Sequence, residues 1–326
     1  MSVTLETFHS TVLQGNPLGD PADRRIPVYL PPGYEDSDRR YPVLFFLTGF
    51  TGKGTMFLNE RAFEETLPQR LDRLIGAGQV QPLIGVMPDC FTRYGGSQYL
   101  NSAATGRYED HLIDELVPWV DKTWRTRGTK SSRAVAGKSS GGYGAIVHGM
   151  RHPDVFGHVL CASGDMYFEY AYWNGFLDTL VTMGKYGGLN KFMETIPTIR
   201  PKDQKWFSLL NTVGMASSYA PNPASPYGFD LPLDERTGAL LPEVWARWKA
   251  WDPVTMVDTH LDALRSLDSL YIECGNRDEF HLQFGARMLV DKLKAANVRH
   301  HYEEFDDGHM NIDYRWDVSL PALNFQ

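Results

Sequence analysis

Short runs of apolar and β-branched residues alternate along the chain with segments whose apolar residues recur every three or four positions. The runs have the length of buried strands, and the spacing of three and four is typical of helices with one buried face. Strands are predicted at residues 26–30, 42–47, 83–87, 133–136, 158–162, 269–274 and 300–305. This alternation predicts an α/β fold in which helices cover both faces of a mostly parallel sheet.

Helices are predicted over residues 59–75, 108–124 and 282–296. In the second of these, apolar residues recur at the spacing of one buried face, at Ile113, Leu116, Val117, Val120 and Trp124. The third helix begins just after Asp278 and Glu279, whose negative charges suit the N-terminal end of a helix.

The segment from about residue 165 to 248 breaks the alternation, because aromatic residues crowd its start and prolines punctuate its later part. It is predicted to be a helical cap followed by an extended loop, inserted after the strand that ends near Ser163. Insertions at this edge of a parallel sheet usually lie beside the binding crevice. Tyr167, Phe168 and Trp173 are therefore candidate substrate contacts, and the alternative is that they form the cap's own small core. Later aromatic residues are interpreted as packing residues, namely Trp206, Phe207, Trp245 and Trp248.

The segment 133–144 combines an apolar strand, a Gly-x-Ser-x-Gly turn and the start of a helix. A sharp turn of this kind holds a serine hydroxyl clear of the backbone, and glycines on either side let strand and helix approach. Gly137 and Gly141 occupy those positions, which makes Ser139 the candidate nucleophile. The five-residue pattern is common, so a glycine-rich loop that merely starts a helix is the alternative. A phosphate-binding loop is disfavoured because the full order Gly-x-x-x-x-Gly-Lys-Ser/Thr is absent around Lys138.

A nucleophilic serine needs a base and an acid, and in this order of elements both follow it, each in a loop after a later strand. Asp278 follows the strand 269–274, and His309 follows the strand 300–305. His309 would accept the proton of Ser139, and Asp278 would orient the imidazole. Glu279 is the rival to Asp278.

The other polar clusters are assigned no chemistry. Acidic residues near His309 could suggest a metal, but they are interpreted as a solvated loop, and neither a metal nor a cofactor is expected; they are Asp306, Asp307 and Asp313. The remaining histidines near predicted helices and strands are interpreted as surface or packing residues, namely His111, His148, His152, His300 and His301. His260 and His281 lie nearer loops but follow no late strand.

The negative oxygen of a tetrahedral intermediate requires preorganised hydrogen-bond donors. The backbone N–H of Ser140, directly after the nucleophile, is the first candidate. The second is the N–H of Phe50, in the glycine-bearing turn Thr48-Gly49-Phe50-Thr51-Gly52 that follows the strand 42–47. An ordinary strand-to-helix turn is the alternative for this loop.

Together these segments resemble the Putative esterase family of α/β-hydrolases, which includes esterase D (S-formylglutathione hydrolase), feruloyl esterase domains, enterochelin-esterase-like proteins and the antigen 85 mycolyltransferases. Besides the nucleophile turn, the resemblance rests on residues 16–21, 28–34, 41–44, 115–118 and 308–309. Many members have His-Gly in the oxyanion loop, where this chain has Thr48-Gly49, so Thr48 is a candidate for the pocket floor. The resemblance implies an α/β-hydrolase fold and a hydrolase that acts through an acyl-enzyme.

Length and charge narrow the class of protein. The 326 residues suit one α/β-hydrolase domain, 1–326, with the cap as an insertion. A formal net charge of −8 disfavours nucleic acid or an anionic membrane as partner, and a small-molecule ester is easier to accommodate. The N-terminus lacks a secretion signal and the three cysteines have no metal-binding or disulfide spacing, so we expect a cytoplasmic protein. The sequence leaves a monomer or a homodimer open.

The leading hypothesis is a serine hydrolase of small carboxylic esters or thioesters. One alternative is an acyltransferase that passes the acyl group to a sugar or lipid alcohol. Another is a non-catalytic binding protein that retains the fold. The acyl and alcohol groups of the substrate are left open.

Overall fold

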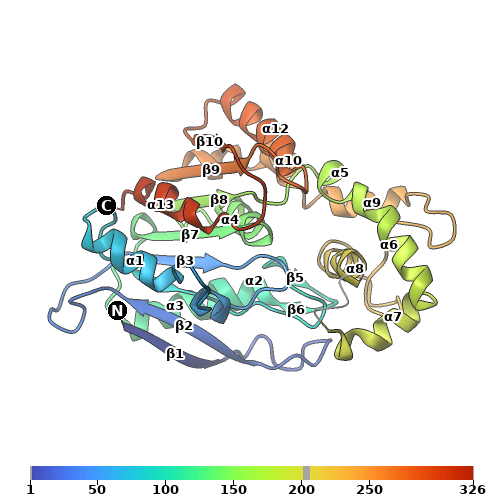
Figure 1. Ribbon diagram of the computed structural model, residues 1–326, viewed down its shortest axis with the longest axis horizontal. Helices are drawn as coiled ribbons and strands as arrows, with labels where there is room; N and C mark the ends of the chain where they lie inside the picture. The colour runs from blue at the N-terminus through green and yellow to red at the C-terminus, as the bar shows by residue number, and fades with distance from the viewer. Residues whose placement is uncertain (1, 201–205, 326) are drawn as a thin grey trace.

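The computed structural model describes residues 2–200 and 206–325. An eight-stranded sheet forms its centre, in the order β1-β2-β4-β3-β7-β8-β9-β10 (Figure 1). The strands are β1 (Ser2–His9), β2 (Asp23–Leu30), β3 (Val43–Leu47), β4 (Ile84–Val86), β7 (Arg133–Lys138), β8 (His158–Ala162), β9 (Ser269–Gly275) and β10 (His301–Phe305). The pairs β1–β2 and β2–β4 are antiparallel and all others are parallel. Strands β5 (Asn101–Ser102) and β6 (Gly106–Arg107) form a separate two-stranded sheet.

Alternate residues of the central strands point into two apolar cores, one on each face of the sheet. Leu44 and Phe46 of β3 pack with α1 (Leu67–Gly76) and with Trp316 of α13 (Trp316–Ser319). Val43 and Phe45 belong to the opposite core, together with α3 (Val117–Thr123), α4 (Ser140–Arg151) and α12 (Leu282–Ala295). Burial on both faces explains why these strands are continuous apolar runs, and it confirms the predicted architecture.

All seven predicted strands are present, with ends shifted by at most three residues. Sequence analysis missed β1, whose residues alternate between exposed and partly buried positions at the edge of the sheet. An edge strand with one solvent-exposed face does not form the continuous apolar run that marks the central strands.

Two predicted helices differ from the structure. The segment 59–75 becomes helical only at Leu67, because Thr66 and Gln69 form a capping box that starts α1 there. Before it lies a short 3-10 turn, η1 (Gly54–Leu58). The segment 108–124 is divided into α2 (Tyr108–Asp110), a π-helical turn η2 (His111–Leu116) and α3, whereas the third predicted helix is confirmed as α12.

The inserted segment lies beside one end of the sheet, at the right of Figure 1. It contains α5 (Phe168–Ala171), α6 (Trp173–Tyr186), α7 (Leu189–Thr195), η4 (Ile196–Thr198), α8 (Phe207–Tyr219) and α9 (Pro242–Lys249). Residues 220–241 between α8 and α9 are largely irregular. The predicted helical cap and the loop after it are therefore confirmed for the described residues of this segment. Residues 201–205 lie outside the described part of the chain. Cap residues such as Phe176 and Trp248 share a core with the sheet. The prediction of one domain with an insertion stays a prediction.

The remaining short helices are η3 (Lys130–Ser132), α10 (Pro253–Met256), η6 (Val257–Thr259), α11 (Leu261–Arg265), η7 (Asp313–Arg315) and η8 (Leu320–Ala322). Within the described part of the chain, every helix is too short or too polar to cross a membrane.

Candidate active site

Ser139 lies at the turn between β7 and α4, with φ 58° and ψ −128°. Residues other than glycine rarely adopt this backbone conformation. The turn is tight on both sides of the serine. A Cβ atom on Gly137 would lie 2.3 Å from the carbonyl carbon of Gly141, and one on Gly141 would lie 2.1 Å from the carbonyl oxygen of Leu47. Only glycine fits at both positions. The chain therefore forms the strained nucleophile turn that the motif predicts.

His309 and Asp278, which come from the loops after β10 and β9, meet at this edge of the sheet. The Nδ1 atom of His309 lies 2.7 Å from Oδ2 of Asp278, and both side chains are almost wholly buried. The other carboxylate oxygen, Oδ1, accepts a hydrogen bond of 2.9 Å from the backbone N–H of Phe280. A carboxylate that accepts the Nδ1 proton fixes the tautomer in which Nε2 carries a lone pair.

Glu279, the rival acid, has a different partner. Its Oε2 atom accepts a hydrogen bond of 2.6 Å from the backbone N–H of His309. It therefore secures the loop, whereas the imidazole ring is bound by Asp278.

Ser139 and His309 line the same cavity, which has a volume of about 370 Å³. The cavity wall is largely apolar and includes Met56, Phe207, Phe280, Met310 and Trp316. Ser139 also lines a smaller adjoining cavity of about 50 Å³, together with Ser140, Asp165 and Asn211. The serine thus stands where two cavities adjoin, as a group that attacks a bound substrate would.

The two predicted oxyanion donors flank the serine. A Cβ atom on Gly49 would lie only 3.5 Å from Cβ of Ser139, so the loop that carries Phe50 runs close to the nucleophile. This loop is fixed by a 2.6 Å hydrogen bond from Thr51 N–H to the Gly95 carbonyl. The N–H of Phe50 has no hydrogen-bond partner among residues 2–200 and 206–325. Ser140 opens α4, where N–H groups lack intrahelical acceptors.

The predicted substrate contacts divide into two groups. Thr48 lines the larger cavity, and its carbonyl oxygen accepts a 2.7 Å hydrogen bond from the Tyr99 hydroxyl. Tyr167, Phe168 and Trp173 line neither cavity. Phe168 is fully buried beside Tyr172, which fits the alternative that the cap aromatics form its core.

Tyr167 packs against Tyr170, and Trp173 is half exposed beside Trp245. Conversely, Phe207, interpreted from the sequence as a packing residue, lines both cavities. The physical reason is that α8 begins at this residue, which places its ring edge-on to Phe50, 6.0 Å away, and leaves it 38% exposed. Trp245 and Trp248 are packing residues as predicted.

Sequence analysis missed Asp165, a buried carboxylate in the smaller cavity. Its Oδ2 atom accepts hydrogen bonds from Gln98 Nε2 at 3.2 Å, Ser140 Oγ at 3.2 Å and the Tyr172 hydroxyl at 3.0 Å. Burial raises the pKa of Asp165 above its usual value. The same signal that identified Asp278 was available, since Asp165 also follows the end of a buried strand, β8.

Solved structures with similar folds define the class of the molecule. A ferulic acid esterase is 22% identical, with a TM-score of 0.63 over 99% of this chain and 97% of that chain. An S-formylglutathione hydrolase of Staphylococcus aureus is 16% identical, with a TM-score of 0.59 over 99% of this chain and 98% of that chain. The fold is therefore that of the α/β-hydrolases.

Sequence comparison assigns the family. Residues 21–324 match the family described as Putative esterase, and the chain belongs to that family. An endo-1,4-β-xylanase/feruloyl esterase of Xylanibacter ruminicola is 33% identical over 144 residues, which cover 43% of this chain and 19% of that protein. An esterase of Mycobacterium tuberculosis is 35% identical over 139 residues, which cover 42% of this chain and 28% of that protein. The chain spans less than a third of the length of either relative.

Proposed function

We propose that the protein is a serine hydrolase of carboxylic esters in which Ser139, His309 and Asp278 form the catalytic triad. One observation carries this proposal. A strained serine and a histidine bound to a buried carboxylate line one cavity, although they come from three distant parts of the chain. Membership of the Putative esterase family supports the same reaction class.

In the proposed reaction, Nε2 of His309 accepts the hydroxyl proton of Ser139 as the serine oxygen attacks the ester carbonyl carbon. The carbonyl oxygen becomes an oxyanion, which accepts hydrogen bonds from the N–H groups of Phe50 and Ser140. The intermediate then expels the alcohol, which takes its proton from His309. Water attacks the acyl-enzyme by the same steps, and the acid leaves.

Asp278 has an orienting and an electrostatic role in this scheme. Its hydrogen bond to Nδ1 keeps the basic lone pair of His309 on Nε2 and stabilises the imidazolium that forms during attack. Because the carboxylate is wholly buried, water does not screen it, and the interaction is stronger than it would be at the surface.

We propose an acyl group with an aromatic ring as the preferred substrate. Five aromatic residues line the larger cavity, namely Phe50, Phe57, Phe207, Phe280 and Trp316, and Met56 and Met310 add flexible apolar surface. A relative whose name includes feruloyl esterase acts on an ester of this chemical kind. We also propose a reducing, cytoplasmic location, because Cys90, Cys161 and Cys274 are free and buried.

A panel of acetyl, butyryl and feruloyl esters and a glutathione thioester tests the proposal, with Ser139→Ala as the inactive variant. Ser266→Ala is the matched control, because this exposed hydroxyl bonds only the nearby Ala263 carbonyl. A fluorophosphonate probe should label the wild type and the control but not Ser139→Ala. Hydrolysis that persists in a folded Ser139→Ala variant would overturn the assignment. New ester formed with an added alcohol, in preference to free acid, would identify an acyltransferase.

A further inference from the structure

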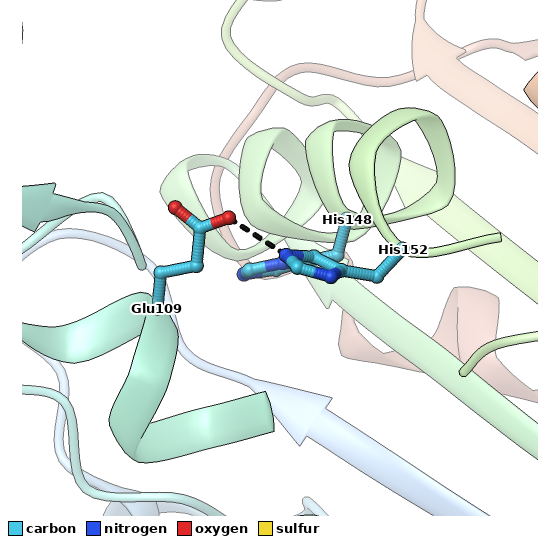
Figure 2. Close-up of side chains that lie close together, drawn as sticks. All are labelled: Glu109, His148 and His152. Atoms are coloured by element: carbon cyan, nitrogen blue, oxygen red, sulfur yellow. Dashed lines mark hydrogen bonds and ion pairs between the residues drawn. The ribbon is translucent and has the colours of Figure 1, made fainter. Parts of the chain in front are cut away.

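A second cluster of chemically active side chains lies at the other end of α4, away from Ser139. Glu109 of α2 faces His148 on α4 and His152 at its C-terminal cap (Figure 2). The Nε2 atom of His152 lies 2.7 Å from Oε1 of Glu109. One ligand atom from each of the three residues lies within 4.8 Å of the other two. The two histidines are four residues apart, so they share one face of the helix.

His148 is the unexplained member of this cluster. Its side chain is fully buried, and a polar neighbour, the backbone of Tyr99, forms no well-aligned hydrogen bond with either ring nitrogen. A buried polar group without a good partner destabilises the folded state. His152 has a partner in Glu109, so hydrogen bonding within the protein accounts for that residue but leaves His148 unaccounted for.

We propose that Glu109, His148 and His152 form a binding site for a divalent transition-metal ion, with zinc as the ion that best fits the ligands. Two neutral imidazole nitrogens and one carboxylate oxygen are a common zinc ligand set, with water as the fourth ligand. Bonds of about 2.0–2.2 Å place tetrahedral ligand atoms about 3.3 Å apart. The ligand atoms now lie within 4.8 Å of one another, so the side chains must approach by up to about 1.5 Å to bind one ion.

The neighbouring Arg151 is compatible with this arrangement. Its guanidinium donates to both oxygens of Glu109, at 2.9 Å to Oε1 and 3.4 Å to Oε2. When Oε1 binds the ion, Oε2 remains available to Arg151, and an outer partner of this kind orients a metal-binding carboxylate. The side chains of His152 and Arg151 are 23% and 36% exposed, so an ion can reach the cluster from the surface.

The site would be structural. His148 lies nine positions after Ser139, a rise of about 13 Å along α4, so the ion would take no part in the ester reaction. It would join α2 to the helix whose first residue is Ser140. Sequence analysis expected no metal here, because Glu109 is about forty residues away from the two histidines and only the fold brings them together.

Zinc titration of the chelator-stripped protein tests the proposal, with a chromogenic chelator as competitor. We expect one equivalent per chain bound with a Kd below about 10 µM, and a Tm about 5 °C higher when free zinc exceeds Kd a hundredfold. Cobalt should give the intense visible absorption of a four- or five-coordinate ion. Absence of an equivalent that binds this tightly would overturn the proposal.

Two variants locate the site. His148→Leu removes both ring nitrogens and fills the buried space with an apolar side chain. Glu109→Gln keeps the shape of the carboxylate but removes its charge. Each should weaken zinc binding at least a hundredfold and abolish the rise in Tm. Wild-type zinc affinity in a folded form of either variant would refute the site. The matched control is His301→Ala, which removes an exposed histidine beside Glu303. This variant should bind zinc as the wild type does.

Discussion

Two histidine–carboxylate pairs in this molecule have the same separation between their bonded atoms, but one borders a cavity and the other is packed between helices. His309 and Asp278 lie 2.7 Å apart in loops after β10 and β9, and His152 and Glu109 lie 2.7 Å apart between helices α4 and α2. His309 forms part of a cavity wall that also contains Ser139. His152 instead stacks obliquely on His148, with ring centroids 5.4 Å apart.

The difference shows that the pair alone does not define the chemistry. A carboxylate fixes the tautomer of a histidine in both places, and the group that faces the second ring nitrogen decides what the histidine does. At the strand ends His309 shares a cavity wall with a strained serine, Ser139, which suits proton transfer. Between the helices His152 lies against a second buried histidine, His148, which suits an ion.

The largest contrast is expected from removal of each histidine. His309→Ala should lower kcat by about 10⁵-fold, because the base is lost. His152→Ala should leave kcat/KM within about twofold and lower the free energy of unfolding by about 1–2 kcal/mol. Ester hydrolysis and urea unfolding of the two purified variants measure these effects. Comparable activity losses in both folded variants would show that the pairs are not functionally distinct.

Replacing the carboxylate that bonds the His309 ring should also lower kcat, by a smaller factor than removal of His309. Asp278→Asn should lower kcat by about 10⁴-fold, since an amide in place of the carboxylate favours the wrong tautomer of His309. Glu279→Gln is the matched control, because Glu279 bonds the backbone of His309 and not its ring. We expect this control to lose less than tenfold. A steady-state assay compares them, and the opposite ranking would make Glu279 the acid of the triad.

A third pair, His111 and Glu115, tests a purely structural role. Their side chains lie 3.1 Å apart, and Glu115 also accepts hydrogen bonds from Thr11. Burial raises the pKa of Glu115, but the hydrogen bonds outweigh it and lower the pKa to about 2. Its stabilising effect is therefore complete above pH 4.5 and is lost as the pH falls towards 2.

Glu115→Gln should thus reduce the free energy of unfolding by about 1–2 kcal/mol at pH 6 and by much less near pH 2. Denaturant unfolding across this range measures the difference, while activity at pH 7 should be unchanged. An equal loss at both pH values would mean that shape, and not charge, accounts for the effect.

Much of the fold and of the candidate triad could be predicted because local patterns encode them. Strands buried on both faces are apolar runs, and Gly137 and Gly141 mark a turn in which no other residue fits. Asp278 follows the buried strand β9 and His309 follows β10, the parallel strand paired with it, so topology alone brings them to one edge.

What could not be predicted depends on contacts between distant segments. The approach of Glu109 to His148 arises from packing of α2 against α4, and the hydrogen-bond partners of Asp165 arise from packing of the cap. The lining of the cavity was missed for the same reason. Aromatic residues are as common in a small core as in a binding site, and nothing in the sequence separates exposed Phe207 from buried Phe168.

The smallest expected effect distinguishes these two kinds of aromatic residue in the cap. Phe207→Ala should raise KM for a feruloyl ester about fivefold and change kcat little, because the ring lines both cavities but touches no reacting atom. The matched control is Trp173→Ala, which removes a somewhat more exposed aromatic side chain that lines neither cavity and should leave KM unchanged. The Phe207 effect should shrink for an acetyl ester, whose acyl group does not reach the ring. If Trp173→Ala raised KM and Phe207→Ala did not, the acyl group would lie against the outer surface of the cap, and the larger cavity would hold only the reacting carbonyl.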